Sequence, residues 1–205
     1  MAWRVLVPIK QTTTAKTRLQ GATRDPADHA QLVHAIQLDT LAAILALSTH
    51  PLFGGLSVVG EPRPGFPSAI EVLADVGGGL NAALAAAALA LAVRFPGDGV
   101  LAVVGDLPAL RPADLLAVLA LAAQHERSFV RDLAGTGTTL LAVAAGRPLA
   151  PLFGLDSAQR HADSGAVELE AGISVRADVD DAEDLRRCLE LGTGLLTTRL
   201  AGLLN

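Results

Sequence analysis

The stretch Val100-Leu101-Ala102-Val103-Val104-Gly105-Asp106-Leu107-Pro108 decides the fold. An unbroken apolar run that ends in turn residues is typical of a strand buried on both faces. Gly105 lets the backbone leave the strand at an unusual angle, and Pro108 prevents the strand ladder from continuing. Asp106 then lies at the carboxyl end of a central strand, the edge at which open α/β sheets bind ligands. A carboxylate there suits a hard cation such as Mg²⁺; the alternative is a turn aspartate that bonds its own backbone.

Composition sets the limits on class. The chain has 205 residues, which fits one domain over residues 1–205 with a sizeable core. The net charge of -5 argues against a nucleic-acid surface, so anionic substrates would need local basic pockets. The longest apolar run, residues 82–93, is too short to span a bilayer, and the amino terminus lacks the pattern of a signal peptide. We therefore expect a cytoplasmic protein with no membrane contact. Nothing in the sequence predicts the oligomeric state.

The rest of the chain alternates between strand and helix patterns. Strands are expected at residues 3–8, 56–60, 69–73, 100–104, 128–132, 140–144 and 173–178, and the main helices at residues 25–47, 80–95, 112–124 and 193–205. This alternation predicts an α/β fold with a largely parallel sheet. Residues 128–178 hold strands with little helix between them, which predicts either a β-rich insertion or an antiparallel edge.

A cationic loop follows the first strand. Residues 9–19 include Lys10, Lys16 and Arg18 together with several hydroxyl side chains, but no Gly-x-x-x-x-Gly-Lys motif. Cations clustered in an acidic protein indicate a loop that wraps an anion. The alternative is a solvated loop with a few basic residues.

A glycine-rich loop precedes the alanine-rich helix. Gly77, Gly78 and Gly79 allow close approach of the backbone to a ligand, and the helix begins near Asn81. Free amides at the start of that helix are suited to an anion or a base edge. A flexible turn is the alternative, because glycine runs commonly form one.

Two further segments offer neutral hydrogen-bond donors. Gly135-Thr136-Gly137-Thr138 offers amides and hydroxyls to phosphate oxygens, or else forms a hairpin turn. Asp156 or Ser157 begins a helix whose first turns carry Ser157 and Arg160, which has the form of an anion site. We expect His161 to be a surface residue of this helix.

A second acidic cluster follows the last expected strand. Alternation along an extended chain puts Asp178 and Asp180 on one side, away from Val179. The acidic residues 181–184 also match the first turn of a helix, where the helix dipole favours negative charge. That account explains Asp180 less well.

Several motifs together give a family resemblance. They are Pro8-Ile9-Lys10 with residues 15–19, Gly105-Asp106-Leu107-Pro108-Ala109-Leu110, Arg127-Ser128-Phe129-Val130 with Gly135-Thr136-Gly137-Thr138, Phe153-Gly154 with Asp156-Ser157 and Arg160-His161, residues 164–169, and Asp178-Val179-Asp180. Over nearly the whole chain they resemble the guanylyltransferases of deazaflavin coenzyme F-420 biosynthesis, which act on 2-phospho-L-lactate or phosphoenolpyruvate. The chain departs from the sugar-nucleotide signature, a glycine-rich loop that ends in Thr-Arg-Met.

The resemblance implies a three-layer, Rossmann-like nucleotidyltransferase fold with a mostly parallel mixed sheet and a small β-rich insertion. It also implies a reaction in which the phosphate of a three-carbon phospho-acid attacks the α-phosphorus of GTP and pyrophosphate leaves. The implied catalytic residues are Lys16, Arg18, Asp106 and Asp180, the last two as Mg²⁺ ligands with Asp178 as the alternative to Asp180. The implied GTP-binding residues are Lys10, Lys16, Arg18, Gly78, Gly79 and Asn81, and the implied acceptor-phosphate residues are Thr138, Gly154 and Ser157.

Two other classes of function stay open. A glycosyltransferase of similar fold could use Asp178-Val179-Asp180 as its metal motif, although the motif lies late in the chain. A non-catalytic regulator would bind GTP without turnover. For the guanylyltransferase, phosphoenolpyruvate, 2-phospho-L-lactate and 3-phosphoglycerate are all candidate acceptors, because pockets discriminate such small differences by only about 1–3 kcal/mol.

Overall fold

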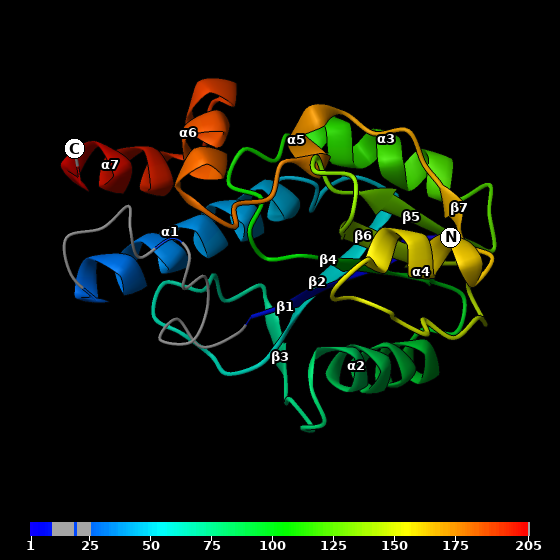
Figure 1. The fold of residues 1–205 in the computed structure, drawn as a ribbon. Coiled ribbons are helices and arrows are strands. Elements are labelled where there is room, and N and C mark those ends of the chain that lie inside the picture. The colour runs from blue at the N-terminus through cyan, green and yellow to red at the C-terminus, as the bar shows by residue number, and fades with distance from the viewer. Residues whose placement is uncertain (10–18, 20–25, 205) are drawn as a thin grey trace.

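The computed structural model describes residues 1–9, 19 and 26–204 and has a central sheet covered by helices (Figure 1). The strands are β1 (Trp3–Pro8), β2 (Phe53–Val59), β3 (Glu71–Leu73), β4 (Gly99–Val103), β5 (Arg127–Arg131), β6 (Thr138–Val143) and β7 (Val167–Glu168). The helices are α1 (Pro26–Leu45), α2 (Leu80–Arg94), α3 (Pro112–Ala122), α4 (Ser157–Asp163), α5 (Ile173–Arg176), α6 (Ala182–Leu191) and α7 (Leu195–Leu204). The order of elements confirms the predicted α/β class.

The sheet is mixed and mostly parallel. Its seven strands lie in the order β3-β2-β1-β4-β6-β5-β7, so the apolar run that begins at Val100 forms the middle strand, β4. Neighbouring strands from β3 through β4 are parallel, β6 runs antiparallel to both β4 and β5, and β5 is parallel to β7. The strands between residues 128 and 178 therefore extend the main sheet, which is the antiparallel alternative of the two predicted.

Helices cover both faces of the sheet. One face of β1 and β4 packs against α1 and α3, through side chains such as Ile44 and Leu119. The opposite face packs against α2 and α4, through Leu84 and Ala158. Figure 1 shows α3 above the strands and α2 below them. None of the helices within the described residues has both the length and the apolar character that crossing a membrane requires.

A third buried cluster lies away from the sheet faces. It joins Ile36 of α1, Ala109 of the loop after β4, Val179, and Leu185 and Cys188 of α6. Burial, followed by the nearby charge of Asp184, raises the pKa of the Cys188 thiol to about 12, so the thiol stays protonated and packs as an apolar group. This cluster attaches α6 and the segment before it to the rest of the molecule.

The last expected strand, at residues 173–178, is wrong. Residues 173–176 form the one-turn helix α5. The hydroxyl of Ser174 donates to Asp114 Oδ2 at 2.6 Å and accepts from the amide of Arg111 at 3.1 Å. These contacts with the start of α3 fix the segment against a helix, although its alternation of apolar and polar residues matches a strand.

Candidate active site

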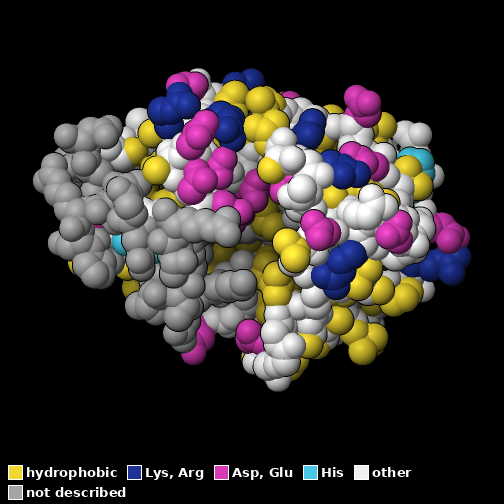
Figure 2. Space-filling model, viewed as in Figure 1, with side chains coloured by type: hydrophobic (Ala, Val, Ile, Leu, Met, Phe, Trp, Pro, Cys, Tyr) yellow, Lys and Arg dark blue, Asp and Glu magenta, His cyan; other side chains and the backbone are white. Residues whose placement is uncertain are grey.

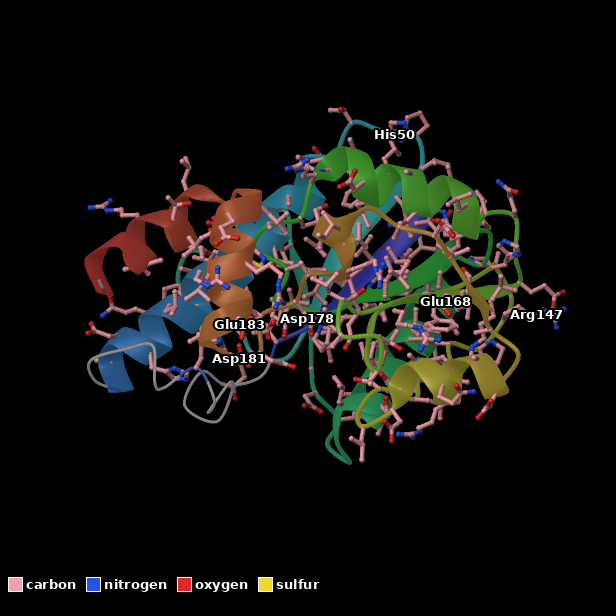
Figure 3. The ribbon with its side chains drawn as sticks, turned by 45° about the horizontal axis from the view of Figure 1, so that its top comes forward. His50, Arg147, Glu168, Asp178, Asp181 and Glu183 are labelled. Carbon is pink, nitrogen blue, oxygen red and sulfur yellow. The ribbon has the colours of Figure 1, made fainter. Side chains whose placement is uncertain are left out.

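Three carboxylates meet at the carboxyl end of β4. One oxygen from each of Asp106, Asp178 and Asp180 lies within 4.8 Å of the others. Asp106 and Asp178 are half-buried and Asp180 is exposed. Figure 2 shows acidic side chains gathered on this face near the start of α6, and Figure 3 shows Asp178 between α6 and the sheet. The predicted meeting of Asp106 with the later acidic motif is therefore present.

The loop after β4 holds Asp106 against the end of β1. A side chain at Gly105 would lie 3.0 Å from Ile9 Cδ1 and 3.2 Å from the carbonyl oxygen of Pro8. Gly105 does not have a positive φ, so the expected unusual backbone angle is wrong. Glycine suits this position because the ends of the two strands approach closely, and a larger residue would require its neighbours to shift.

A threonine of α1 fixes the same loop from the other side. The hydroxyl of Thr40 accepts a hydrogen bond from the amide of Leu107 at 3.0 Å and donates to the carbonyl of Ile36 at 2.9 Å. Thr40 is fully buried. Next along the loop, the carbonyl of Pro108 accepts from the amide of Gly194 at 2.9 Å. These contacts give the backbone beside Asp106 a defined position that sequence patterns did not reveal.

The start of α6 supports the second acidic segment. Asp181 caps the helix, since its carboxylate accepts from the amides of Glu183 and Asp184 at 2.9 and 3.0 Å. Asp184 accepts from the amide of Asp180 at 3.2 Å. Capping thus accounts for Asp181, as the helix interpretation predicted, while Asp178 and Asp180 each bring a carboxylate oxygen within 4.8 Å of one of Asp106.

The donor set fits a hard divalent cation. Three carboxylates supply only oxygen ligands, which Mg²⁺ and Mn²⁺ accept. Their negative charges repel one another at this separation, and a bound cation offsets that repulsion. Magnesium is commonly bound by only a few protein carboxylates and completes its coordination shell with water and substrate phosphates. The exposure of Asp180 leaves such ligands access to the cluster.

The predicted acceptor residues lie together around the start of α4. The amide of Ser157 donates to the carbonyl of Gly154 at 3.1 Å, and the amide of Ala158 donates to the carbonyl of Thr136 at 3.1 Å. The second bond draws α4 toward the start of β6, where Thr138 lies. Because the amide of Ser157 is already bonded, its hydroxyl is the group that this residue can offer to a ligand. The role of these residues in phosphate binding stays a prediction.

The Gly-Thr-Gly-Thr segment is a hairpin turn. The carboxylate of Asp132 accepts hydrogen bonds from the amides of Gly135, Thr136 and Gly137 at 2.6, 3.0 and 2.8 Å. These amides are satisfied by the protein itself, so the predicted use of them as a phosphate cradle is wrong. The hydroxyls of Thr136 and Thr138 are left from that prediction.

His161 is not the surface residue that was expected. It is fully buried, with the rings of Phe129 and Phe153 at 5.9 and 5.3 Å between centroids. Burial, and after it the charges of Arg127 and Arg160, lowers the pKa of the imidazole to about 4. The ring is therefore neutral near pH 7.

The residues assigned to GTP divide into three groups. Gly78 and Gly79 are exposed and have φ angles of 77° and 89°, directly before α2. Asn81 has a structural partner, because its side-chain amide donates to the carbonyl of Phe153 at 3.0 Å and accepts from the amide of the same residue at 2.9 Å. It thus ties the start of α2 to the segment that carries Gly154. The cations Lys10, Lys16 and Arg18 lie outside the described residues.

Comparison with known proteins gives close relatives of nearly equal length. A Streptomyces coelicolor protein named phosphoenolpyruvate guanylyltransferase is 48% identical over 208 residues, covering 98% of this chain and 96% of the relative. A Streptomyces avermitilis protein of the same name is 45% identical over 207 residues, covering 98% and 94%. No protein-family model matches the chain.

Solved structures share the fold at low sequence identity. A 4-diphosphocytidyl-2C-methyl-D-erythritol synthase aligns with a TM-score of 0.60 and 14% identity over 93% of this chain and 98% of its own. A Mycobacterium tuberculosis H37Rv protein in complex with manganese aligns with a TM-score of 0.50 and 22% identity over 92% and 98%. The architecture is thus that of the nucleotidyltransferases, as the sequence resemblance implied.

Proposed function

Because the chain belongs to the phosphoenolpyruvate guanylyltransferase family, we propose that it joins the GMP unit of GTP to phosphoenolpyruvate and releases pyrophosphate. The observation that carries this proposal is identity of 48% over nearly the full length of both chains. The product is a guanylated enol acid with a new phosphoanhydride. We infer from the resemblance of the sequence motifs that this product serves the biosynthesis of coenzyme F-420.

The chemistry needs little from a protein base. An oxygen of the acceptor phosphate forms a bond to the α-phosphorus of GTP, and the bond from that phosphorus to the β-phosphate oxygen breaks. A phosphate monoester has its second pKa near about 6, so the nucleophile is already mostly ionised at neutral pH. Charge neutralisation and in-line positioning are the remaining requirements.

We assign the carboxylates Asp106, Asp178 and Asp180 as the ligands of Mg²⁺, on the geometry of the cluster. The metal would neutralise phosphate charge and bring the two anionic substrates together. The protein contributes the position of the ligands. Thr40 holds the backbone of the loop that carries Asp106, and Asp184 holds the amide of Asp180.

The two substrates are assigned to different segments, which the hydrogen bonds between Asn81 and Phe153 join. We propose that Gly78 and Gly79, with Lys10, Lys16 and Arg18, bind GTP, because glycine backbones allow close approach and cations neutralise a triphosphate. For Asn81 the hydrogen bonds to Phe153 favour a supporting role. Thr138, Gly154 and Ser157 are assigned to the acceptor phosphate, because the hydroxyls of Thr138 and Ser157 can donate hydrogen bonds to it without adding positive charge.

The test is incubation of the purified protein with GTP, Mg²⁺ and one of three acids: phosphoenolpyruvate, 2-phospho-L-lactate or 3-phosphoglycerate. Pyrophosphate release is followed by a coupled assay, and the guanylated product is identified by mass spectrometry. We expect turnover with phosphoenolpyruvate and little with the other two. Cleavage of a nucleotide-sugar would instead indicate a glycosyltransferase, and GTP binding without turnover with any acid would indicate a regulator.

A further inference from the structure

A buried hydrogen bond links α4 to the start of β6, and it involves Thr138, one of the residues assigned to the acceptor phosphate. Thr138 Oγ1 and His161 Nδ1 are 2.9 Å apart, and both residues are buried. His161 lies one helical turn after Ser157, so its ring lies close to both hydroxyl residues assigned to the acceptor phosphate. The direction of this hydrogen bond decides what the hydroxyl of Thr138 can offer to a ligand.

The other ring nitrogen reveals the tautomer. The backbone amide of Leu152 donates a hydrogen bond to His161 Nε2 at 3.0 Å, so Nε2 is the acceptor and carries no proton. The ring is fully buried and neutral near pH 7, and it therefore carries one proton. That proton is on Nδ1. The bond between the side chains thus runs from His161 Nδ1–H to the oxygen of Thr138.

This direction fixes the role of the threonine. Since Thr138 Oγ1 accepts from the ring, the proton of its own hydroxyl points to another acceptor. With the opposite tautomer the hydroxyl would donate to the ring and present only lone pairs to a ligand. A phosphate oxyanion accepts hydrogen bonds and has none to donate, so it favours the first arrangement.

We propose that His161 is a positioning residue that makes the hydroxyl of Thr138 a hydrogen-bond donor to the acceptor's phosphate. This inference rests on the proposed function, because it takes the ligand beside Thr138 to be the phospho-acid. His161 touches no reacting atom. It acts through Thr138, and the amide of Leu152 sets its tautomer.

The tautomer is tested directly on the unaltered protein. ¹⁵N NMR of histidine-labelled full-length chain distinguishes protonated from unprotonated ring nitrogens, and comparison with His161→Phe assigns the signals. We expect a neutral ring at pH 7 with the proton on Nδ1. A proton on Nε2, or an imidazolium, would overturn the proposal, and this readout requires neither substrate nor turnover.

The functional link is tested by a double-mutant cycle on KM for phosphoenolpyruvate. Thr138→Val and His161→Phe should each raise this KM, the first by about ten- to a hundredfold, the range for a lost hydrogen bond to a charged group. KM for GTP should change little. The double variant should be no worse than Thr138→Val alone, and Thr138→Ser should retain most of the affinity.

Additive losses in the double variant, or equal effects on both KM values, would indicate a merely structural histidine and refute the proposal. If His161→Phe does not fold, the ring signals of His161 are assigned by through-bond correlation in the unaltered chain, and a proton on Nε2 would still overturn the proposal. If none of the three phospho-acids is turned over but the proton of His161 is on Nδ1, the proposed function is wrong and the direction of the hydrogen bond is right.

Discussion

The amide of Val179 donates a hydrogen bond to the carbonyl oxygen of Asp106, with 3.1 Å between nitrogen and oxygen. This bond joins two segments that are far apart in the sequence and holds them side by side at the end of the central strand. The side chain of Val179 is fully buried, so Asp178 and Asp180 on either side of it are turned toward the Asp106 carboxylate. The separation of the acidic segments is thus set by backbone contacts.

The first prediction concerns these carboxylates. Asp106→Asn, Asp178→Asn and Asp180→Asn each remove one ligand charge at nearly constant shape. We expect each to lower kcat by about 100-fold or more, the scale of one lost electrostatic contact in a transition state. The melting temperature without metal should change little. Steady-state pyrophosphate release and thermal unfolding are the measurements.

Glu190→Gln is the matched control for the carboxylate series. Glu190 is an exposed residue of α6 that pairs with Arg186 at 2.6 Å, away from the acidic cluster. An exposed pair of this kind contributes little to stability, so activity and melting temperature should stay close to those of the unaltered protein. Full activity in any one of the three aspartate variants would remove that residue from the ligand set.

The second prediction concerns Thr40. Thr40→Val keeps the volume but leaves the buried amide of Leu107 without its acceptor, which costs about 1–3 kcal/mol. Because that amide follows Asp106 directly, we expect a lower melting temperature together with weaker Mg²⁺ binding, measured by calorimetric titration. Thr40→Ser restores the hydroxyl and should recover most of both. A lower melting temperature with unchanged Mg²⁺ affinity would mean that Thr40 stabilises the fold without positioning the metal loop.

The fold could be predicted from the sequence where the local pattern of apolar residues agrees with the tertiary surroundings of the segment. The apolar run ending at Val104 is covered on both faces in the structure, as expected of a central strand. The strand predicted at residues 173–178 was wrong because the alternation of apolar and polar residues there indicates a strand. The hydrogen bonds of Ser174 to Asp114 and Arg111, which hold the segment as a helix, are tertiary contacts that the local sequence does not reveal. The same holds for the carboxylate of Asp132. It accepts hydrogen bonds from three backbone amides of residues 135–137, so this segment forms a hairpin turn and not a phosphate-binding loop.

The site was predictable in its charged residues and not in its supporting ones. Asp106 follows an apolar run and a turn motif that place a carboxylate at a sheet edge. Asp178 and Asp180 follow the helix α5 and not the expected strand, and the backbone bond from Val179 to Asp106 brings them to the same edge. His161 was assigned to the surface because a lone histidine in a short polar helix carries no sign of burial. Its partners Phe129 and Leu152 come from other segments and become neighbours only when the sheet has formed. Thr40 escaped notice for the same reason.

The third prediction concerns pH. Burial lowers the pKa of His161 to about 4, below its ordinary value near about 6.5. Between these values the unfolded chain binds a proton that the folded chain excludes. The contribution to stability is therefore fully present above about pH 6.5 and is lost as the pH falls toward 4, by up to about 1.4 kcal/mol per pH unit.

Urea unfolding of the unaltered protein and of His161→Phe at several pH values from about 7.5 to 4.5 isolates this contribution, because other titrating groups act on both proteins. The difference in free energy of unfolding between the two should shrink as the pH falls. A difference that is constant over this range would mean that the histidine titrates alike in both states, and the buried neutral ring would be wrong.

The last prediction separates the two substrate pockets. Ser157→Ala removes only a hydroxyl, since the amide of Ser157 already donates to Gly154 in the fold. The expected loss is a hydrogen bond to a charged group, about 1.5–3 kcal/mol, or a rise of roughly tenfold to a hundredfold in the Kd of the acceptor. GTP affinity should barely change. Lys16→Ala should do the reverse, because a cation assigned to the triphosphate contributes to GTP binding and not to the acceptor. Calorimetric titration of each ligand against each variant is the measurement, and weaker GTP binding by Ser157→Ala would mean that the two pockets are assigned the wrong way round.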